Sequence, residues 1–338
     1  MAGTYSIDDT VTANYKSFNE AITDMTSRGI CGAITFNVYP ATYKEQITLV
    51  ELPGMNASNP VKFINVGKDS TKILVTLPSS TATGTNNAVV QLRGADYVTF
   101  KGISFERTGT NTYGHVIHII NGSNNNTFTN CQILGLTLIS PNANAINIWS
   151  DQGQDNNNVF RNNYIKNGNY GIIFTGVNTV RESGTVVEGN TFENGFSYAV
   201  QLAYNDAAIV KGNTFLNINT ATSGNYDLQL LDCDSNIRVE GNFFKDVLTD
   251  IGVLLTGCNA SKSNPGIVAN NAIIKPSGKA ISLDGVDNQS IVFNSISVYG
   301  SASTNAGIYT SGTTSSNIVL KNNNIVMEGG DVFYLSLI

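Results

Sequence analysis

Carboxylates in the central and C-terminal parts of the chain are the residues best suited to cleave a bond. Five aspartates follow short apolar segments, and they are Asp151, Asp232, Asp234, Asp284 and Asp287. Asp232 and Asp284 are close in the alignment of a sequence repeat, and glycoside hydrolysis requires such a pair of carboxyl groups. A calcium-dependent lyase requires a carboxylate cluster and a base, for which Arg238, Lys245 and Lys279 are the candidates. The alternative is structural, because an isolated Asp commonly hydrogen-bonds its own turn.

A second set of residues suits the binding of a sugar polymer. Tyr170, Tyr198 and Tyr226 are each separated by 28 residues and align on three consecutive copies of the repeat. The outward positions of the adjoining strand are predicted to be His118, Asn147, Ile173, Gln201, Gln229, Leu254, Ser282 and Tyr309, with Trp149 and Tyr204 just beyond. Aromatic rings and amides on one flat sheet suit a neutral or weakly charged glycan. The alternative is surface packing, since stacked rings contribute about 0.5–1.5 kcal/mol per pair without any ligand.

Histidines and cysteines carry no pattern typical of a metal site. His115 and His118 are the only histidines, and strand alternation places residues i and i+3 on opposite faces, so they form a poor metal pair. Cys233 and Cys258 align at one position of adjacent repeats, where the strand spacing of about 4.8 Å is compatible with a disulfide. We therefore predict that these two side chains are in contact, with a disulfide only if the protein is exported. We predict no metal and no cofactor, except calcium if the protein is a lyase.

A repeat centred on asparagine must position these residues. Successive copies such as GTVVEGNTFENG (184–195) and SNIRVEGNFFKDV (235–247) are 23 to 32 residues apart. The central column holds Asn163, Asn190, Asn213, Asn242, Asn271, Asn294 and Asn323, with Ile103 and Cys131 in the earliest copies. A period of this length is typical of a solenoid, and inward Asn side chains satisfy backbone groups at a tight corner. We therefore interpret this column as structural.

Short strands complete each copy. They are predicted at residues 115–120, 144–149, 170–174, 198–202, 226–230, 251–255, 279–283 and 306–310. With no helix between them, these strands predict parallel β-structure wound as a helix. Residues 10–30 predict an amphipathic helix, with Ser17 and Glu20 as a capping box and Gly29 at its end. We expect one domain over 1–338: a capping helix at about 10–30, irregular first coils at 33–94, and regular coils at 95–338.

Composition narrows the classes of function. The net charge of −6 and pI near 4.9 disfavour nucleic acid, which requires a basic surface. No apolar run approaches the roughly 18 residues of a membrane span. The 45 Asn and 32 Gly residues suit a fold with many tight corners. The N-terminus has no signal-peptide pattern, and the chain ends within a predicted strand, so we expect a module of a longer exported protein whose signal is absent here.

The coils resemble the right-handed parallel β-helix repeats of the pectin lyase-like superfamily. The N-terminal segment YKSFNEAITDMTSRGICGAITFNVYPATYKEQITL is similar to the capping start of secreted β-helix proteins from Bacteroidetes-type bacteria. The resemblance covers nearly the whole chain and implies an all-β fold. The expected architecture is a right-handed single-stranded parallel β-helix (solenoid) with an N-terminal capping α-helix. Lyases, hydrolases, epimerases, adhesins and spacers share this fold, so it does not decide the activity.

Two hypotheses about function follow. The first is a bacterial extracellular module, secreted or on the cell surface, that binds a polysaccharide or cell-surface glycan or serves as a structural or adhesin segment. The second is a polysaccharide lyase or glycoside hydrolase with its site on the outward strand face. Polar amide faces and the lack of a convergent catalytic cluster favour the first, so we expect a protein that is not an enzyme. An ice-binding surface is disfavoured because it requires a flat repeated array of Thr.

Overall fold

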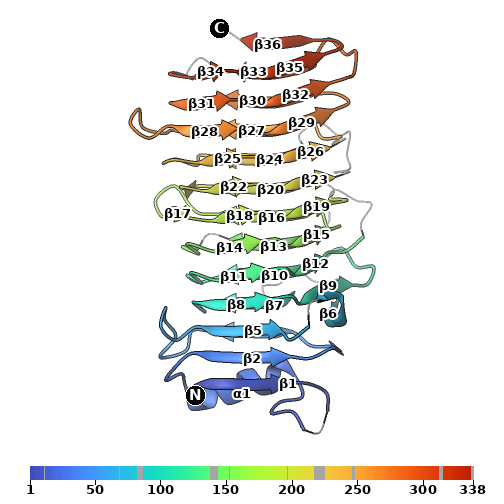
Figure 1. Ribbon diagram of the computed structural model, residues 1–338, viewed down its shortest axis with the longest axis vertical. Coiled ribbons are helices and arrows are strands. Elements are labelled where there is room, and N and C mark those ends of the chain that lie inside the picture. Colours follow the sequence, from blue (N-terminus) through green and yellow to red (C-terminus); the bar gives the residue numbers. More distant parts are fainter. Residues whose placement is uncertain are drawn as a thin grey trace.

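The computed structural model describes residues 1–10, 12–67, 69–81, 87–137, 144–151, 153–195, 197–216, 225–245, 248–311 and 315–335. In this part of the chain the strands form three long parallel sheets of 12, 11 and 11 strands, named here sheets A, B and C. The chain visits sheets A, B and C in turn, so each coil contributes one strand to each sheet and the coils stack along one axis (Figure 1). The all-β solenoid expected from the repeat is confirmed.

The strands keep this order from one end to the other. Sheet A contains β1 (Gly3–Ile7), β2 (Ile34–Val38), β5 (Val61–Asn65), β8 (Val98–Lys101), β11 (Thr127–Thr129), β14 (Val159–Arg161), β18 (Val186–Glu188), β22 (Ile209–Lys211), β25 (Arg238–Glu240), β28 (Gly266–Ala269), β31 (Gln289–Val292) and β34 (Val319–Lys321). Sheet B contains β3 (Ala41–Tyr43), β6 (Ile73–Pro78), β9 (Ser104–Thr108), β12 (Gln132–Leu134), β15 (Tyr164–Lys166), β19 (Thr191–Glu193), β23 (Thr214–Leu216), β26 (Phe243–Lys245), β29 (Ala272–Lys275), β32 (Ser295–Val298) and β35 (Asn324–Met327). Sheet C contains β4 (Ile47–Val50), β7 (Ala88–Arg93), β10 (His115–Ile120), β13 (Ile146–Asp151), β16 (Tyr170–Thr175), β20 (Tyr198–Ala203), β24 (Tyr226–Leu231), β27 (Ile251–Thr256), β30 (Lys279–Asp284), β33 (Ala306–Ser311) and β36 (Asp331–Leu335). A small pair, β17 (Glu182–Ser183) with β21 (Asn205–Asp206), and a short 3₁₀ helix, η1 (Ser70–Lys72), complete the set.

The N-terminal helix is shorter than predicted. Helix α1 spans Phe18–Arg28, whereas the sequence predicted a helix over about 10–30. It begins at this point because the Ser17 hydroxyl caps it by accepting the Glu20 amide proton at 3.1 Å. The preceding residues 8–10 and 12–16 are instead outside any helix, and Ile7, the last residue of β1, bridges Tyr15. Helix α1 lies at the N-terminal end of the solenoid with its apolar face buried, as expected for a cap (Figure 1).

The asparagine column joins consecutive coils at the corner between sheets A and B. Asn190 donates its amide N–H to Oδ1 of Asn213 at 2.9 Å, and Nδ2 of Asn213 donates to the carbonyl of Val187 at 2.8 Å. The same pattern runs from Asn163 to Asn323. The residue before each asparagine of the column has a positive φ, between 55° and 65°, which explains the Gly or Asn found there in most coils. The column therefore satisfies buried backbone groups at a left-handed corner.

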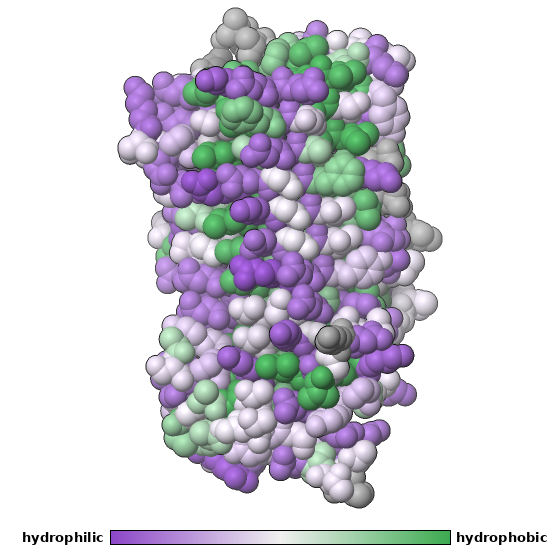
Figure 2. Space-filling model, viewed as in Figure 1, coloured by the Kyte–Doolittle hydropathy of each residue, from purple (hydrophilic) through white to green (hydrophobic). Residues whose placement is uncertain are grey.

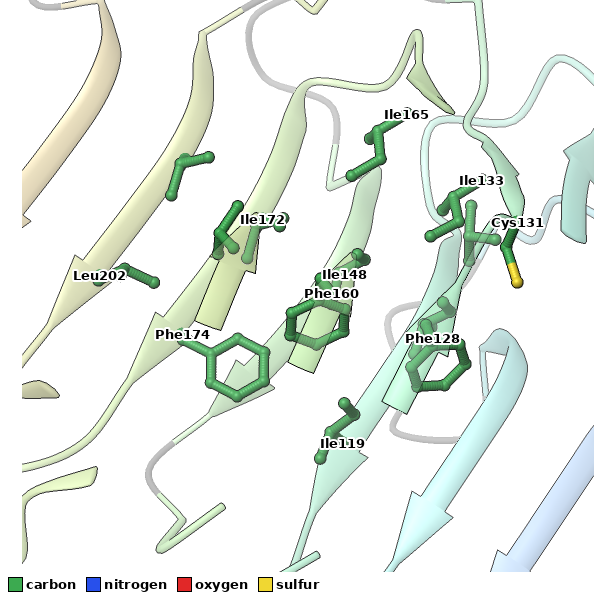
Figure 3. Packing of buried hydrophobic residues seen from close by; sticks show 14 of the residues in the cluster. Ile119, Phe128, Cys131, Ile133, Ile148, Phe160, Ile165, Ile172, Phe174 and Leu202 are labelled. Atoms are coloured by element: carbon green, nitrogen blue, oxygen red, sulfur yellow. The ribbon is translucent and has the colours of Figure 1, made fainter. Parts of the chain in front are cut away.

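The core is a set of stacked side chains between the three sheets. Figure 3 shows Phe128 and Phe160 on adjacent coils, with their ring centroids 5.9 Å apart, and Phe174 edge-on to Phe160 at 5.5 Å. From Phe174 onward the aromatic column moves to sheet B, where Phe192 and Phe215 stack at 5.0 Å. Vertical stacking of this kind fixes the coil register, because slipping a strand by one residue would place these rings outside.

Strands of sheet C are bent, and this changes which residues face outward. In β16, Gly171 and Ile172 are both buried, whereas Tyr170, Ile173 and Thr175 are partly exposed. The alternation is therefore interrupted after the first residue, and positions one, four and six of these strands share the outer face. Residues i and i+3 consequently lie on the same side, contrary to the sequence-based expectation.

Candidate functional site

A column of three tyrosines runs along the solenoid axis on the outer face of sheet C. Tyr170 and Tyr198 stack with centroids 5.4 Å apart and an interplanar angle of 13°, and Tyr226 follows at 5.5 Å with a tilt of 45°. Stacked faces cover one another, so the column presents ring edges and hydroxyls rather than open faces. Burial raises the pKa of Tyr198 and Tyr226, which keeps both hydroxyls protonated and able to donate hydrogen bonds.

An amide pair lies beside this column. Gln201 and Gln229 occupy the fourth position of adjacent strands, and Nε2 of Gln201 donates to Oε1 of Gln229 at 2.5 Å. Leu254, next in the same row, is almost fully buried. The tyrosines and the amide pair, called here the tyrosine–amide face, thus form a continuous surface of hydrogen-bonding groups bordered by an apolar residue.

A hollow of about 300 Å³ lies further along the same sheet, towards the C-terminal end. Its lining includes Lys279, Tyr309 and Tyr334. The Lys279 ammonium lies 3.7 Å from the Tyr309 ring centroid, and Tyr309 stacks on Tyr334 at 4.9 Å. The sequence had offered Lys279 as a base and Tyr309 as an outward residue. The Lys279 ammonium instead makes a cation–π contact with Tyr309, which explains the position of Lys279 without a ligand.

Trp149 and Tyr204 were predicted just beyond the strand, but Trp149 lies within the outward row of sheet C and Tyr204 lies in the turn after β20. Strand β13 begins two residues later than predicted, so Trp149 occupies the outward row between His118 and Ile173. Asn147, which was expected there, is buried and donates from Nδ2 to the carbonyl of Asn167 at 3.0 Å. Tyr204 has a φ of 50° at the turn after β20, with the Arg181 guanidinium 5.7 Å from its ring centroid.

The two histidines share one face, so their predicted placement on opposite faces was wrong. The ring centroids of His115 and His118 are 5.8 Å apart, and both rings contact Trp149, at 4.5 and 4.3 Å. The bend in sheet C explains the error, because it turns residues i and i+3 to the same side. Both rings are nearly inaccessible to solvent, at 4% and 1% exposure.

The candidate catalytic aspartates lie on coils separated by one intervening coil. They are thus two strand spacings apart along the solenoid axis, about 9.6 Å, and Asp232 is one residue past the position in register with Asp284. Asp232 has a φ of 48° and its Oδ1 lies along Gly257 of the intervening coil. Of the basic candidates, Arg238 lies on sheet A bonded to Glu240, and Lys245 lies on sheet B. Neither of these two shares a sheet with the aspartates.

Sequence reasoning missed a buried acidic cluster beneath sheet C. The Ser150 hydroxyl oxygen lies 2.8 Å from Asp155 and 2.7 Å from Glu182, and all three residues are fully buried. One hydroxyl can donate only one proton, so it must accept a proton from one of the two carboxyl groups. Burial raises the pKa of Glu182 to about 8 and also raises that of Asp155, which identifies Glu182 as the protonated acid. The available signal was Ser150 itself, a polar residue in an inward row otherwise filled by residues such as Ile119 and Phe174.

The cysteines are all thiols. Cys233 and Cys258 are buried on adjacent coils with their side chains in contact, but no disulfide joins them. Cys131 fills the asparagine column, where its N–H donates to Oδ1 of Asn163 at 2.9 Å. Over the described residues, no group of three or more His, Cys, Asp or Glu side chains could hold a metal ion. In that same part of the chain, no helix has the length and apolar character needed to span a membrane.

Comparison with known proteins identifies the class of fold. Residues 87–246 match the family model described as a right handed beta helix region. Together with the three parallel sheets, this match shows that the chain has a right-handed parallel β-helix fold. The comparison with curated proteins finds no match.

Solved structures with this fold differ in their roles. A GH136 lacto-N-biosidase from Eubacterium ramulus is 10% identical with a TM-score of 0.63, covering 98% of this chain and 68% of that one. An alginate lyase from Paenibacillus sp. str. FPU-7 is 13% identical with a TM-score of 0.54, covering 98% of each chain. PfbA, a surface adhesin of Streptococcus pneumoniae, is 15% identical with a TM-score of 0.56, covering 98% of this chain and 93% of that one. Such identities establish the fold alone, and the fold serves several activities.

Proposed function

We propose that this protein binds a polysaccharide along the outer face of sheet C, as a non-catalytic module of a bacterial surface or secreted protein. The observation that carries the proposal is the tyrosine column, in which Tyr170, Tyr198 and Tyr226 follow the solenoid axis. A column in this direction presents the same hydroxyl and ring edge once per coil. A linear polymer can therefore make repeated contacts along it.

The chemistry of the face favours a neutral or weakly charged glycan. Protonated tyrosine hydroxyls both donate and accept hydrogen bonds, and so do the amides of Gln201 and Gln229. Only 13% of the chain is charged, and the net charge of −6 disfavours strongly acidic polymers. On the face of the molecule seen in Figure 2, hydrophobic residues form small separate groups among hydrophilic ones.

Affinity electrophoresis in gels containing neutral plant, algal and bacterial polysaccharides tests the proposal. We expect at least one polymer to retard the protein, and Tyr198→Ala to weaken that retardation about tenfold, because Tyr198 contacts both neighbouring rings. Tyr164→Ala is the matched control, since the Tyr164 hydroxyl is bonded to Glu193 on sheet B at 2.5 Å. Retardation that is equal in the wild type and Tyr198→Ala would place the glycan elsewhere.

A lyase or hydrolase is the second candidate, and one observation favours it. Asp232 Oδ1 lies close to the position that a Cβ on Gly257 would take, on the coil between Asp232 and Asp284. An inverting hydrolase operates with its carboxyl groups roughly 6.5–9.5 Å apart. Incubation with the same polymers, with and without calcium, separates the two functions by polymer size. Shortening that is lost in Asp232→Asn and Asp284→Asn would establish an enzyme, whereas we expect no shortening.

Location outside the cell is part of the proposal, because that is where the polysaccharide partner is found. Antibody labelling of intact cells, compared with lysed cells, tests it. Signal from intact cells is the expected result, and signal that requires lysis would contradict it.

A further inference from the structure

Arg107 is a buried cation with no hydrogen-bonding partner among the described residues. It is the fourth residue of β9, two positions after the inward Phe105, and its side chain is 3% exposed. Its Nε lies against the backbone of Gly114, directly before His115. Nε and Nη1 are both buried without a partner, and the ion pairs of the described chain do not include this residue.

A second buried polar group lies nearby, on the residue that follows Gly114. Nδ1 of His115 is also buried and has no hydrogen-bonding partner among the described residues. Burial lowers the pKa of His115 to about 3, with smaller contributions from the nearby His118 and Arg107, so its ring is neutral at ordinary pH. Arg107 keeps its charge, because burial lowers its pKa only to about 10. The site therefore holds one positive charge.

The site borders the surface through Trp149. This indole stacks on His118 at 4.3 Å with an interplanar angle of 7°, contacts His115 at 4.5 Å, and is partly exposed. Flat rings next to a guanidinium form a setting that suits a flat ligand. Trp149 is also the only tryptophan of the chain, so the tryptophan fluorescence of the protein comes from this ring alone.

A buried guanidinium with unpaired N–H groups is unfavourable unless an anion satisfies it. A single positive charge is matched by a monoanion, whereas a dianion would introduce an unpaired negative charge. Guanidinium pairs with planar carboxylate through two parallel hydrogen bonds, which a spherical ion such as chloride does not allow.

We propose that Arg107 and His115 form a binding site for a carboxylate monoanion, with the guanidinium as the charged partner and Nδ1–H of His115 as an additional donor. The carboxylate comes either from a small free acid or from a uronic acid unit of a glycan. The site lies on strands β9 and β10, apart from the tyrosine–amide face, and it does not depend on the proposed glycan binding.

Tryptophan fluorescence tests the proposal directly. Sodium acetate replaces sodium chloride stepwise at constant ionic strength and pH 7 while Trp149 emission is recorded. We expect a saturable change that Arg107→Met abolishes and that Arg107→Lys weakens at least tenfold, because Lys lacks the planar fork. Arg161→Met is the matched control, since Arg161 is exposed and paired with Glu188 on sheet A, and it should behave as wild type.

Thermal unfolding gives an independent readout in the absence of carboxylate. Removing an unpaired buried charge is neutral or stabilising, so Arg107→Met should unfold at the same or a higher temperature than wild type in chloride, and acetate should raise the midpoint of the wild type only. A linear or absent fluorescence change, or one retained in Arg107→Met, would overturn the proposal. A lower midpoint of Arg107→Met in chloride would also contradict it.

Two further probes distinguish the source of the carboxylate. Sodium glucuronate and a polyuronate are titrated at equal carboxylate concentration. Saturation by acetate and glucuronate alone assigns the site to small acids, and tighter saturation by the polyuronate assigns it to a glycan. Affinity electrophoresis of Arg107→Met separates the two proposals. If this variant loses the fluorescence change but is still retarded by the glycan, the carboxylate site is distinct from the tyrosine–amide face.

Discussion

Two strands of sheet C present the same positions in opposite ways. In β10, the first and fourth residues are His115 and His118, and both are buried at 4% and 1% exposure. In β20, the same positions hold Tyr198 and Gln201, and both are partly exposed. We call these the covered stretch and the open stretch of sheet C. Only the open stretch offers hydrogen-bonding groups to a long polymer.

The difference shows that strand geometry sets the direction in which a side chain points, whereas the segments that connect the strands determine whether solvent reaches it. Near the covered stretch, the segments between sheets B and C pair with one another, as Tyr113 bridges both Ser80 and Asn144. A polar residue placed outward by its strand therefore becomes a buried group there. In the open stretch the same placement yields a surface.

The boundary between the two stretches should be sensitive to pH. Ser150 belongs to β13 and Glu182 follows β16, so the buried acid pair joins the last covered coil to the first open one. The pKa of Glu182 is raised from 4.5 to about 8, so between these values the folded state binds more protons than the unfolded state. The stabilisation is complete below about pH 4.5 and is lost progressively as pH rises to about 8, by roughly 5 kcal/mol in total.

Urea unfolding at pH 6 and pH 9 measures this effect. The wild type should lose stability over that interval, and Glu182→Gln should be nearly independent of pH, because the amide donates to Ser150 in both conditions. Equal loss in the variant would assign the pH dependence to other groups.

The asparagine column should matter more under the open stretch than under the covered one. Asn213 accepts from the Asn190 amide and donates to the Val187 carbonyl, so Asn213→Ala leaves two buried groups unpaired and should cost about 3 kcal/mol. Cys131 fills the same column in a covered coil and bonds the Phe100 carbonyl only weakly, through sulfur at 3.6 Å. Cys131→Ala should therefore cost about 1 kcal/mol. Urea midpoints of the two variants check the difference, and equal losses would show that the column acts as packing alone.

Sequence reasoning was sufficient for the column and insufficient for the covered stretch. The column is a strictly repeated residue type at a left-handed corner, so one alignment identifies every member. Arg107 and Ser150 also left a signal, since each is polar at an inward position. The cover over His118 left none, because it depends on contacts between segments that are distant in sequence and variable in length. The start of β13 was predicted two residues too early, because the apolar alternation that predicted a strand at 144–149 continues through the observed strand, Ile146–Asp151.

One substitution in each stretch should separate glycan binding from folding stability. Tyr198→Ala in the open stretch should weaken glycan binding about tenfold, or about 1.4 kcal/mol, and should also lower stability by about 1 kcal/mol, because Tyr198 contacts the rings of Tyr170 and Tyr226. His118→Ala in the covered stretch should leave glycan binding unchanged and lower stability by about 1 kcal/mol, because the ring stacks on Trp149. Affinity electrophoresis and thermal unfolding of both variants test this. Loss of glycan binding in His118→Ala would extend the binding surface to the covered stretch.

The smallest effect should come from the charged row on sheet A, behind the open stretch. Arg161, Glu188 and Lys211 are in register on adjacent strands, with Arg161 and Glu188 paired at 2.8 Å. These side chains are exposed, so Glu188→Gln should cost about 0.5 kcal/mol at low salt. The cost should vanish in 1 M salt, where screening acts within about 3 Å. Urea midpoints at the two salt concentrations measure it. A loss above about 2 kcal/mol would mean that the ion pairs, rather than the buried asparagine column and stacked rings, hold the open coils in register.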